Sequence, residues 1–251
     1  FEHANRVDPW LLEFLKNELE IKSFDVYEKS QLIDYTNLEP IYNLSQAEHK
    51  FSPWSPLPHE NINDENPDIF TVIRGRDQLA HHPYENFTST VERFIRQAAD
   101  DPQVLAIKMS LYRTNEESSF VRSLIKAAEA GKQVVCVVEL KARFDEAKNI
   151  NWATKMENAG VHVVYGIVGL KTHCKTALVV RQEEGGIQCY AHIGTGNYHA
   201  QTAKFYTDFG LFTADEQVGR DLTRLFNELS GYAIEKKFKR LLVAPLHLRK
   251  G

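Results

Sequence analysis

The most regular feature of the chain is an alternation of apolar runs with helical patterns in its middle third. Runs rich in apolar and β-branched residues predict buried strands at 104–112, 133–140 and 161–167. The intervals between them carry apolar residues at helical spacing, and Gly131 and Gly160 end the two predicted helices. This order of strands and helices is typical of parallel βαβ units.

Further elements flank these units. The pattern predicts helices at 85–99 and near 215–230, and strands at 173–181 and 187–194 joined by a glycine-containing hairpin loop. We therefore predict an α/β fold with a mixed, largely parallel sheet flanked by helices.

The first 70 residues differ in character. Trp10, Phe14 and their apolar neighbours predict a helix within residues 1–50, whereas the stretch 52–70 contains four prolines and marks a linker or domain boundary. The chain starts with Phe1, and the apolar run Leu241–Ala244 begins close to its last residue. We expect it to be part of a longer protein.

Composition excludes some classes of protein. Of the 251 residues 43% are hydrophobic, and the net charge of −4 gives no support for nonspecific nucleic-acid binding, so we expect no nucleic-acid partner. Three widely spaced cysteines within apolar runs are typical of buried free thiols and indicate a reducing, cytoplasmic setting. No apolar stretch approaches the roughly 20 residues that span a bilayer.

The first candidate for chemistry is a histidine and a lysine at the start of an apolar run. Side chains alternate between the faces of a strand, so His173 and Lys175 share one face of the strand predicted at 173–181. Alone, the pair is better explained by a structural edge histidine beside a solvated lysine.

Two arginines change this picture. Arg113 and Arg143 each follow a predicted buried strand, and ligands of open α/β sheets bind at the carboxyl ends of strands. Guanidinium groups match phosphate oxygens well. Structural ion pairs, for instance with Glu139 or Asp145, are the alternative for each arginine.

A glycine-rich turn follows the strand predicted at 187–194. Gly194 and Gly196 allow close backbone approach, and Thr195 and Asn197 supply short polar side chains, as a phosphate-binding turn requires. A tight turn without a ligand is the alternative. Tyr206 is suited either to stacking on a base or to packing.

Together these residues favour a histidine that attacks phosphorus. Imidazole is a competent nucleophile near neutral pH, and surrounding cations neutralise charge on the transferred group. We expect six cations to surround one cleft, namely Lys108, Arg113, Lys141, Arg143, Lys171 and Lys175.

Five long motifs in fixed order resemble the bacterial polyphosphate kinases of the phosphohistidine type. They are VIRGRDQLAHHPYENF (72–87), KMSLYRT (108–114), VVELKARFDE (137–146), GLKTHCKTALVVR (169–181) and HIGTGNYHAQTAKFYTDFGL (192–211). The resemblance extends over roughly residues 1–250 and is strongest from 72 to 230.

The resemblance implies a role for each matching residue. His173 corresponds to the histidine that accepts the γ-phosphate of ATP and passes it to the end of an inorganic polyphosphate chain, with ADP as the other product. Arg113 and Arg143 correspond to phosphate-site arginines associated with Mg²⁺. We interpret this association as contact through bound phosphate, because a guanidinium cannot ligate a cation. Tyr206 matches a residue that contacts ATP.

Lys175 and Asn197 match the residues by which the family is similar to the phospholipase D superfamily. The phospholipase D signature continues to an Asp five residues after the lysine, where this chain has Val180. The departure favours kinase-type transfer over the first alternative, a phospholipase D-like phosphodiesterase. The second alternative is a noncatalytic polyanion-binding module.

The resemblance also implies a domain organisation. Residues 1–58 would be the tail of a preceding, head-like α+β domain with its linker, 59–235 a phospholipase D-like first catalytic domain, and 236–251 the start of a second catalytic domain. For the full-length enzyme it implies further ATP contacts, peripheral membrane association and homo-oligomer formation. We expect little or no kinase activity from these 251 residues alone.

Overall fold

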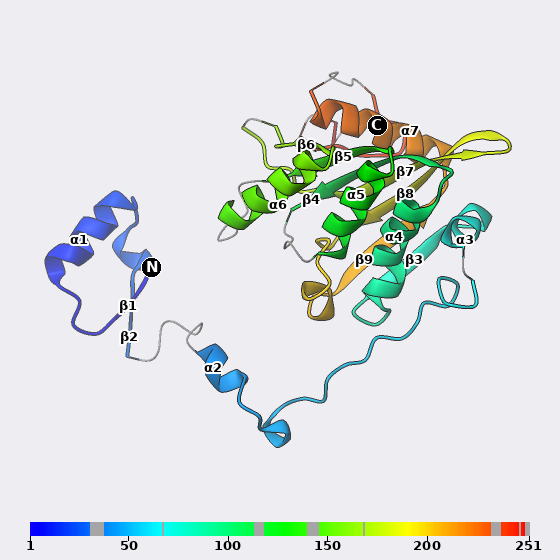
Figure 1. The fold of residues 1–251 in the computed structure, drawn as a ribbon. Helices are drawn as coiled ribbons and strands as arrows, with labels where there is room; N and C mark the ends of the chain where they lie inside the picture. The colour runs from blue at the N-terminus through cyan, green and yellow to red at the C-terminus, as the bar shows by residue number, and fades with distance from the viewer. Residues whose placement is uncertain are drawn as a thin grey trace. The chain divides into compact units, whose positions relative to one another are not determined.

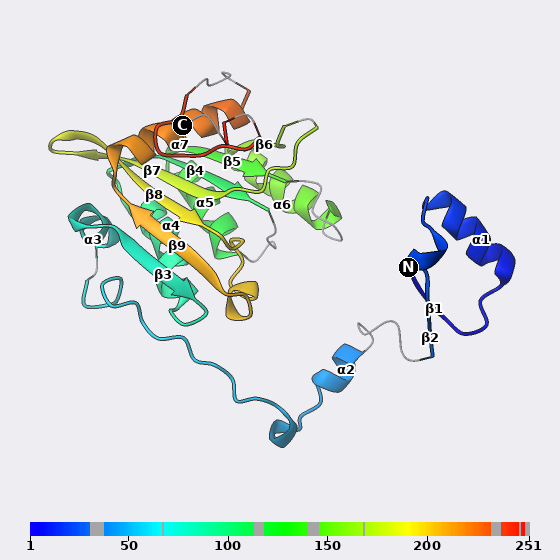
Figure 2. The same cartoon turned by 180° about the vertical axis from the view of Figure 1, so that it is seen from behind.

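The computed structural model divides the chain into two compact units, Phe1–Pro53 and Trp54–Gly251. It describes residues 1–30, 38–66, 68–112, 118–139, 146–167, 169–231, 237–245 and 247–248. Figure 1 shows the course of the chain through each unit, and Figure 2 shows the same ribbon from behind. The predicted boundaries at residues 58 and 235 stay predictions, and the second falls within the stretch 232–236, outside the described residues.

The first unit is small and exposes most of its apolar side chains. Strands β1 (Glu2–Ala4) and β2 (Tyr27–Lys29) pair in parallel, and helix α1 (Pro9–Glu18) lies between them in sequence, with the short helix α2 (Glu39–Tyr42) following. The Asp8 carboxylate caps α1 by accepting the Trp10 amide at 2.8 Å. Trp10 and Phe14 stack with ring centroids 5.5 Å apart. The predicted helix is confirmed.

The second unit is built on one seven-stranded sheet in the order β3-β9-β8-β7-β4-β5-β6. Its strands are β3 (Gln78–His82), β4 (Val104–Leu111), β5 (Gln133–Val138), β6 (His162–Val164), β7 (Lys175–Glu183), β8 (Gly186–Gly194) and β9 (Asp208–Thr213).

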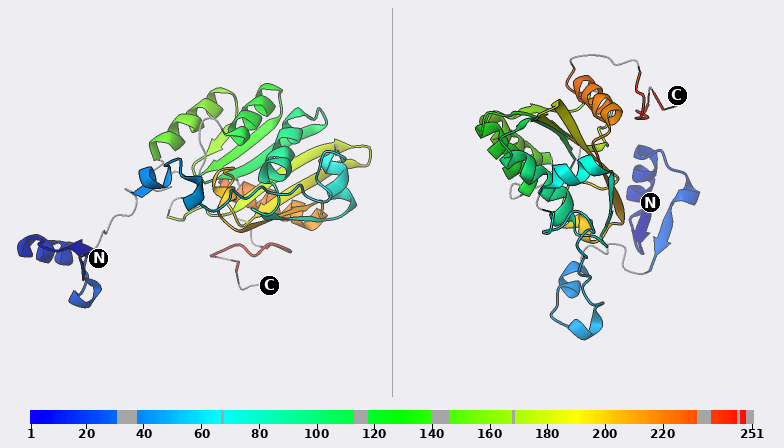
Figure 3. Two further views of the ribbon diagram at one scale, coloured as in Figure 1. Left: turned by 90° about the horizontal axis from the view of Figure 1, so that it is seen from below. Right: turned by 90° about the vertical axis from the view of Figure 1, so that its right-hand side faces the viewer.

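Helices cover both faces of this sheet (Figure 3). They are α3 (Ile69–Gly75), the π-helical turn η4 (Thr88–Glu92) continuing into α4 (Arg93–Asp100), α5 (Ser119–Glu129), α6 (Glu146–Asn158) and α7 (Glu216–Leu229). The larger apolar core, which includes Phe94, Phe120 and Trp152, lies under α3–α6. A second core, which includes Leu178, Leu222 and Phe226, lies under α7.

The mixed α/β class is confirmed, but the expectation of a largely parallel sheet is wrong. Among the described strands of this sheet, the pairings β4–β5 and β5–β6 are parallel, whereas β7–β4, β7–β8, β8–β9 and β3–β9 are antiparallel. A parallel neighbour needs a crossover that returns the chain to the strand's starting edge. No such helix lies among the described residues between β6 and β7. The chain therefore starts β7 at the edge of the sheet where β4 and β5 end, and β7 runs antiparallel to β4.

Most predicted elements lie within a few residues of their expected places. The strands predicted at 104–112 and 133–140 are β4 and β5, and the helix predicted near 215–230 is α7. The strand predicted at 173–181 starts at Lys175, so His173 precedes it. The sequence reasoning did not predict β3 and β9, which form one side of the sheet.

Candidate active site

His173 lies in the loop immediately before β7, at the edge where β4 and β5 end. Its side chain is exposed, while Thr172 before it and Lys175 after it are buried. The Thr172 amide donates a 2.7 Å hydrogen bond to the Glu139 carboxylate, just after β5. The imidazole is therefore exposed to solvent, while the backbone just before it is fixed by a buried hydrogen bond.

The Tyr112 ring gathers three of the polar side chains. The His173 ring meets it edge-on with centroids 5.7 Å apart. The Nζ atoms of Lys171 and Lys175 each lie 5.2 Å from the Tyr112 ring centroid, within cation–π range. Because Tyr112 directly follows β4, this contact depends on the pairing of β4 with β7.

Lys175 is buried, with 6% of its surface exposed, and its Nζ donates to the backbone carbonyl of His173. Burial lowers the pKa of Lys175, and Lys171 lowers it further, whereas Cys174 and Asp208 act in the opposite direction. His173 and Lys175 were predicted to share one face of a strand. In the structure, His173 lies before β7 with its side chain exposed, and Lys175 is the buried first residue of β7.

The electrostatic surroundings keep His173 neutral at neutral pH. The charge of Lys175 is the main cause that lowers the pKa of His173, followed by partial burial and the charge of Lys171. A neutral imidazole retains the lone pair that a nucleophile needs.

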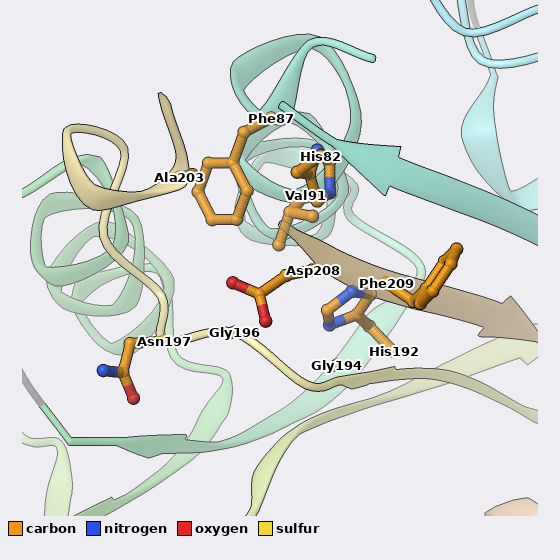
Figure 4. Close-up of a pocket in the computed structure, with 11 residues that line it drawn as sticks. His82, Phe87, Val91, His192, Gly194, Gly196, Asn197, Ala203, Asp208 and Phe209 are labelled. Carbon is orange, nitrogen blue, oxygen red and sulfur yellow. The ribbon is translucent and has the colours of Figure 1, made fainter. Parts of the chain in front are cut away.

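The glycine-rich turn is braced by Asp208, the first residue of β9. The Thr195 hydroxyl donates to an Asp208 carboxylate oxygen at 2.7 Å and accepts the Phe209 amide at 3.0 Å. A Cβ at Gly196 would lie 2.4 Å from the Asp208 carboxylate, so glycine is required there. Figure 4 shows this carboxylate beside the turn. The Thr195 hydroxyl is therefore engaged within the protein, and phosphate binding by this turn stays a prediction.

Asn197 continues this turn and is partly buried. Among the residues that the structure describes, its side-chain oxygen has no hydrogen-bond partner. Tyr206, in the loop before β9, is 65% exposed and is not one of the side chains that pack on Tyr112.

Behind the turn lie two buried histidines, His82 and His192 (Figure 4). Nδ1 of His192 and the Tyr198 hydroxyl are 2.8 Å apart, and a Cβ at Gly210 would lie 2.5 Å from His192 Nε2. Burial lowers the pKa of His192 to about 3, so the ring stays neutral at physiological pH. The ring of His192, on β8, therefore packs directly against the backbone of β9 at Gly210.

The six cations expected around one cleft are only partly brought together. Lys108 lies on the face under α7, where its Nζ donates to the Asn227 side chain at 3.3 Å, and it is not one of the side chains that pack on Tyr112. Arg113, Lys141 and Arg143 lie outside the described residues. Lys171 and Lys175 remain beside His173.

A cavity of about 570 Å³ adjoins His173. Its lining is mainly apolar and comes from the loop before β7, from α7 and from the segment Leu241–Pro245. The buried Asp221 carboxylate holds this segment by accepting the amides of Lys239, Arg240 and Leu241 at 2.7, 2.6 and 3.1 Å.

The described ranges contain neither a cluster of metal-binding side chains nor a membrane-spanning helix. No group of three or more His, Cys, Asp or Glu side chains is placed there to hold a metal ion. None of the helices in those ranges combines the length and apolar character that a membrane crossing requires.

Comparison with known proteins identifies the family. The family described as polyphosphate kinase C-terminal domain 1 matches residues 68–235. The polyphosphate kinases of Mycobacterium avium (strain 104) and Streptomyces coelicolor are 52% and 51% identical to the chain over its whole length. The chain spans 34% of the length of each.

A solved structure agrees with this match. The crystal structure of polyphosphate kinase from Porphyromonas gingivalis aligns with a TM-score of 0.75 and 32% identity, covering 99% of this chain and 39% of that one. The chain therefore belongs to the polyphosphate kinase family, and its residues 68–235 correspond to C-terminal domain 1 of that family.

Proposed function

We propose that the full-length protein is an ATP:polyphosphate phosphotransferase and that His173 is its phosphoacceptor. The observation that carries this proposal is the exposed imidazole of His173, which lies with the ammonium groups of Lys171 and Lys175 on the Tyr112 ring, where these charges lower its pKa. The relatives' name, polyphosphate kinase, supplies the substrates.

The reaction has two transfers. An imidazole nitrogen of His173 attacks the γ-phosphorus of ATP, the bond from that phosphorus to the β–γ bridging oxygen breaks, and ADP leaves with the electron pair. A terminal oxygen of polyphosphate then attacks the phosphorus, and the N–P bond breaks to regenerate the imidazole. Lys171 and Lys175 lower the energy of the negatively charged phosphoryl group in both steps.

The other predicted residues complete the site in this proposal. Asn197 contacts phosphate through its side chain, and Tyr206 contacts ATP from its exposed position. Arg113 and Arg143 would bind phosphate oxygens, and Mg²⁺ bound through the same phosphate groups would neutralise their charge. The phospholipase D-like arrangement, cytoplasmic location, oligomer formation and peripheral membrane association belong to the same proposal for the full-length protein.

The phosphodiesterase alternative is disfavoured by the surroundings of Val180. This residue stands where the phospholipase D signature has an aspartate, and it packs against the apolar core under α7.

The test uses the full-length protein and ATP labelled at the γ-phosphate. We expect acid-labile, alkali-stable label on the wild type and none on His173→Ala, whereas His162→Ala, which changes an exposed histidine on β6, should label normally. Label on His173→Ala would refute the assignment. Phosphodiester hydrolysis without ATP would favour the phosphodiesterase, and polyphosphate binding without any phosphoenzyme would favour the binding module.

A further inference from the structure

Glu139 is a buried carboxylate that the proposed chemistry does not use. It directly follows β5, and only 6% of its surface is exposed. Its Oε2 accepts the Thr172 amide at 2.7 Å, and Thr172 directly precedes His173. The carboxylate therefore fixes the backbone one residue before the proposed phosphoacceptor.

The carboxylate is itself anchored to the strands around it. The Glu139 amide donates to the Leu111 carbonyl at 3.1 Å, and Leu111 is followed by Tyr112, on which the His173 ring packs. Two contacts thus hold the histidine relative to the end of β4: one through its own ring and one through Glu139 and Thr172.

A third chain segment closes over this junction. Gly166, in the loop after β6, has a φ of +59°, and a Cβ there would lie 3.2 Å from the Thr172 hydroxyl and 4.0 Å from Glu139 Oε2. The hydrogen bond between Glu139 and Thr172 is therefore surrounded by protein. In such surroundings a hydrogen bond to a charged acceptor is stronger than one to a neutral acceptor.

We infer that Glu139 is a positioning residue, which holds the Thr172–His173 backbone so that the imidazole faces the γ-phosphate in line for attack. This inference rests on the proposed function of His173. Glu139 does not touch the reacting atoms; it acts through the Thr172 amide. Loss of such positioning by about 1 Å can slow a transfer on the order of 100-fold.

The test compares two variants in the full-length protein. Glu139→Met fills a similar volume without an acceptor, and Glu139→Gln keeps an acceptor oxygen. At saturating labelled ATP we expect Glu139→Met to slow phosphoenzyme formation by roughly 10- to 100-fold, with the half-saturating ATP concentration changed less than about twofold. Glu139→Gln should recover most of the rate. Should Glu139→Met not fold, Glu139→Ala gives the same comparison.

Asp101→Asn is the matched control. Asp101 accepts from Arg181 at 2.8 Å toward the opposite end of β7, so this change removes a structural ion pair without touching the His173 loop. We expect a phosphorylation rate close to wild type. An equal loss of rate in Asp101→Asn would mean that Glu139 has a merely structural role and would overturn the inference.

Two further results would overturn it: a wild-type rate in Glu139→Met, or a rate in Glu139→Gln as low as in Glu139→Met. Hydrogen exchange at the Thr172 amide separates this inference from the proposed function. We expect faster exchange in Glu139→Met than in wild type even if no variant, nor the wild type, forms a phosphoenzyme. Unchanged exchange would show that the hydrogen bond does not hold the loop.

Discussion

The imidazole of His173 lies beside two ammonium groups, and this neighbourhood decides its protonation. Lys175 and Lys171 disfavour the imidazolium form, which lowers the pKa of His173 below its usual value. The nucleophilic form is then present at neutral pH and remains present somewhat below the usual pKa. In the proposed function, the same two charges are available to the transferred phosphoryl group.

Replacing the exposed Lys171 by Met tests this effect. With one cation removed, the imidazolium is less disfavoured, so the pKa of His173 should rise and the acid limb of phosphoenzyme formation should move to higher pH. NMR titration of the His173 ring protons measures the shift. Lys126→Met, on α5, is the control and should leave the titration unchanged. A pKa that stays constant in Lys171→Met would contradict this account.

At this scale the sequence predicted the polar residues but not their partners. His173 and Lys175 lie close together because they are two positions apart in the chain, although β7 begins only at Lys175 and they do not share a strand face. Tyr112 and Glu139 reach them only because β7 pairs with β4 in one register and because β5 ends beside it. No local pattern contains that register.

At the scale of the elements, strong apolar runs were enough to predict β4, β5, β7, β8 and the main helices. β3 and β9 were missed because they are short and interrupted: β3 (Gln78–His82) has a glutamine and two histidines among its five residues, and β9 (Asp208–Thr213) begins with an aspartate and contains Gly210. The antiparallel insertion of β7 was missed because it depends on the route of the chain after β6. Periodicity along a strand carries no information on the direction of its neighbour.

The packing of α7 on β8 depends on one glycine. A Cβ at Gly219 would lie 2.7 Å from Cys189 Cβ, so Gly219→Ala must separate the helix from the sheet. We expect a loss of about 1–3 kcal/mol in the free energy of unfolding, measured by urea denaturation. Gly75→Ala, at the end of α3, meets no atom within 4 Å and should have little effect or stabilise slightly. Equal effects of the two changes would show that α7 can shift freely.

For the whole molecule, buried histidines make stability depend on pH. His192 has a folded-state pKa of about 3, and burial lowers the pKa of His82 as well. Below the ordinary pKa of about 6.5 the unfolded chain binds protons that the folded chain does not. These histidines therefore cost no stability above this pH, and the free energy of unfolding decreases as the pH falls from about 6.5 toward 3.

The expected slope for His192 is about 1.4 kcal/mol per pH unit between pH 6 and pH 4. Urea denaturation at several pH values measures it, and the carboxylates contribute equally to wild type and variant. His192→Gln, which cannot titrate, should show a shallower slope than wild type, whereas the surface change His162→Ala should not. Parallel slopes for wild type and His192→Gln would indicate that the histidine is not held neutral.

The β7–β8 hairpin separates the sheet edge beside His173 from a remote turn. His173 precedes the nine-residue strand β7, which is roughly 26 Å long at about 3.3 Å per residue, and the turn at Glu184–Gly185 follows its last residue. A fluorophore or a short affinity tag inserted at this turn would report on the protein from a point remote from the proposed site. The strand that begins beside the proposed phosphoacceptor thus offers an attachment point at its other end.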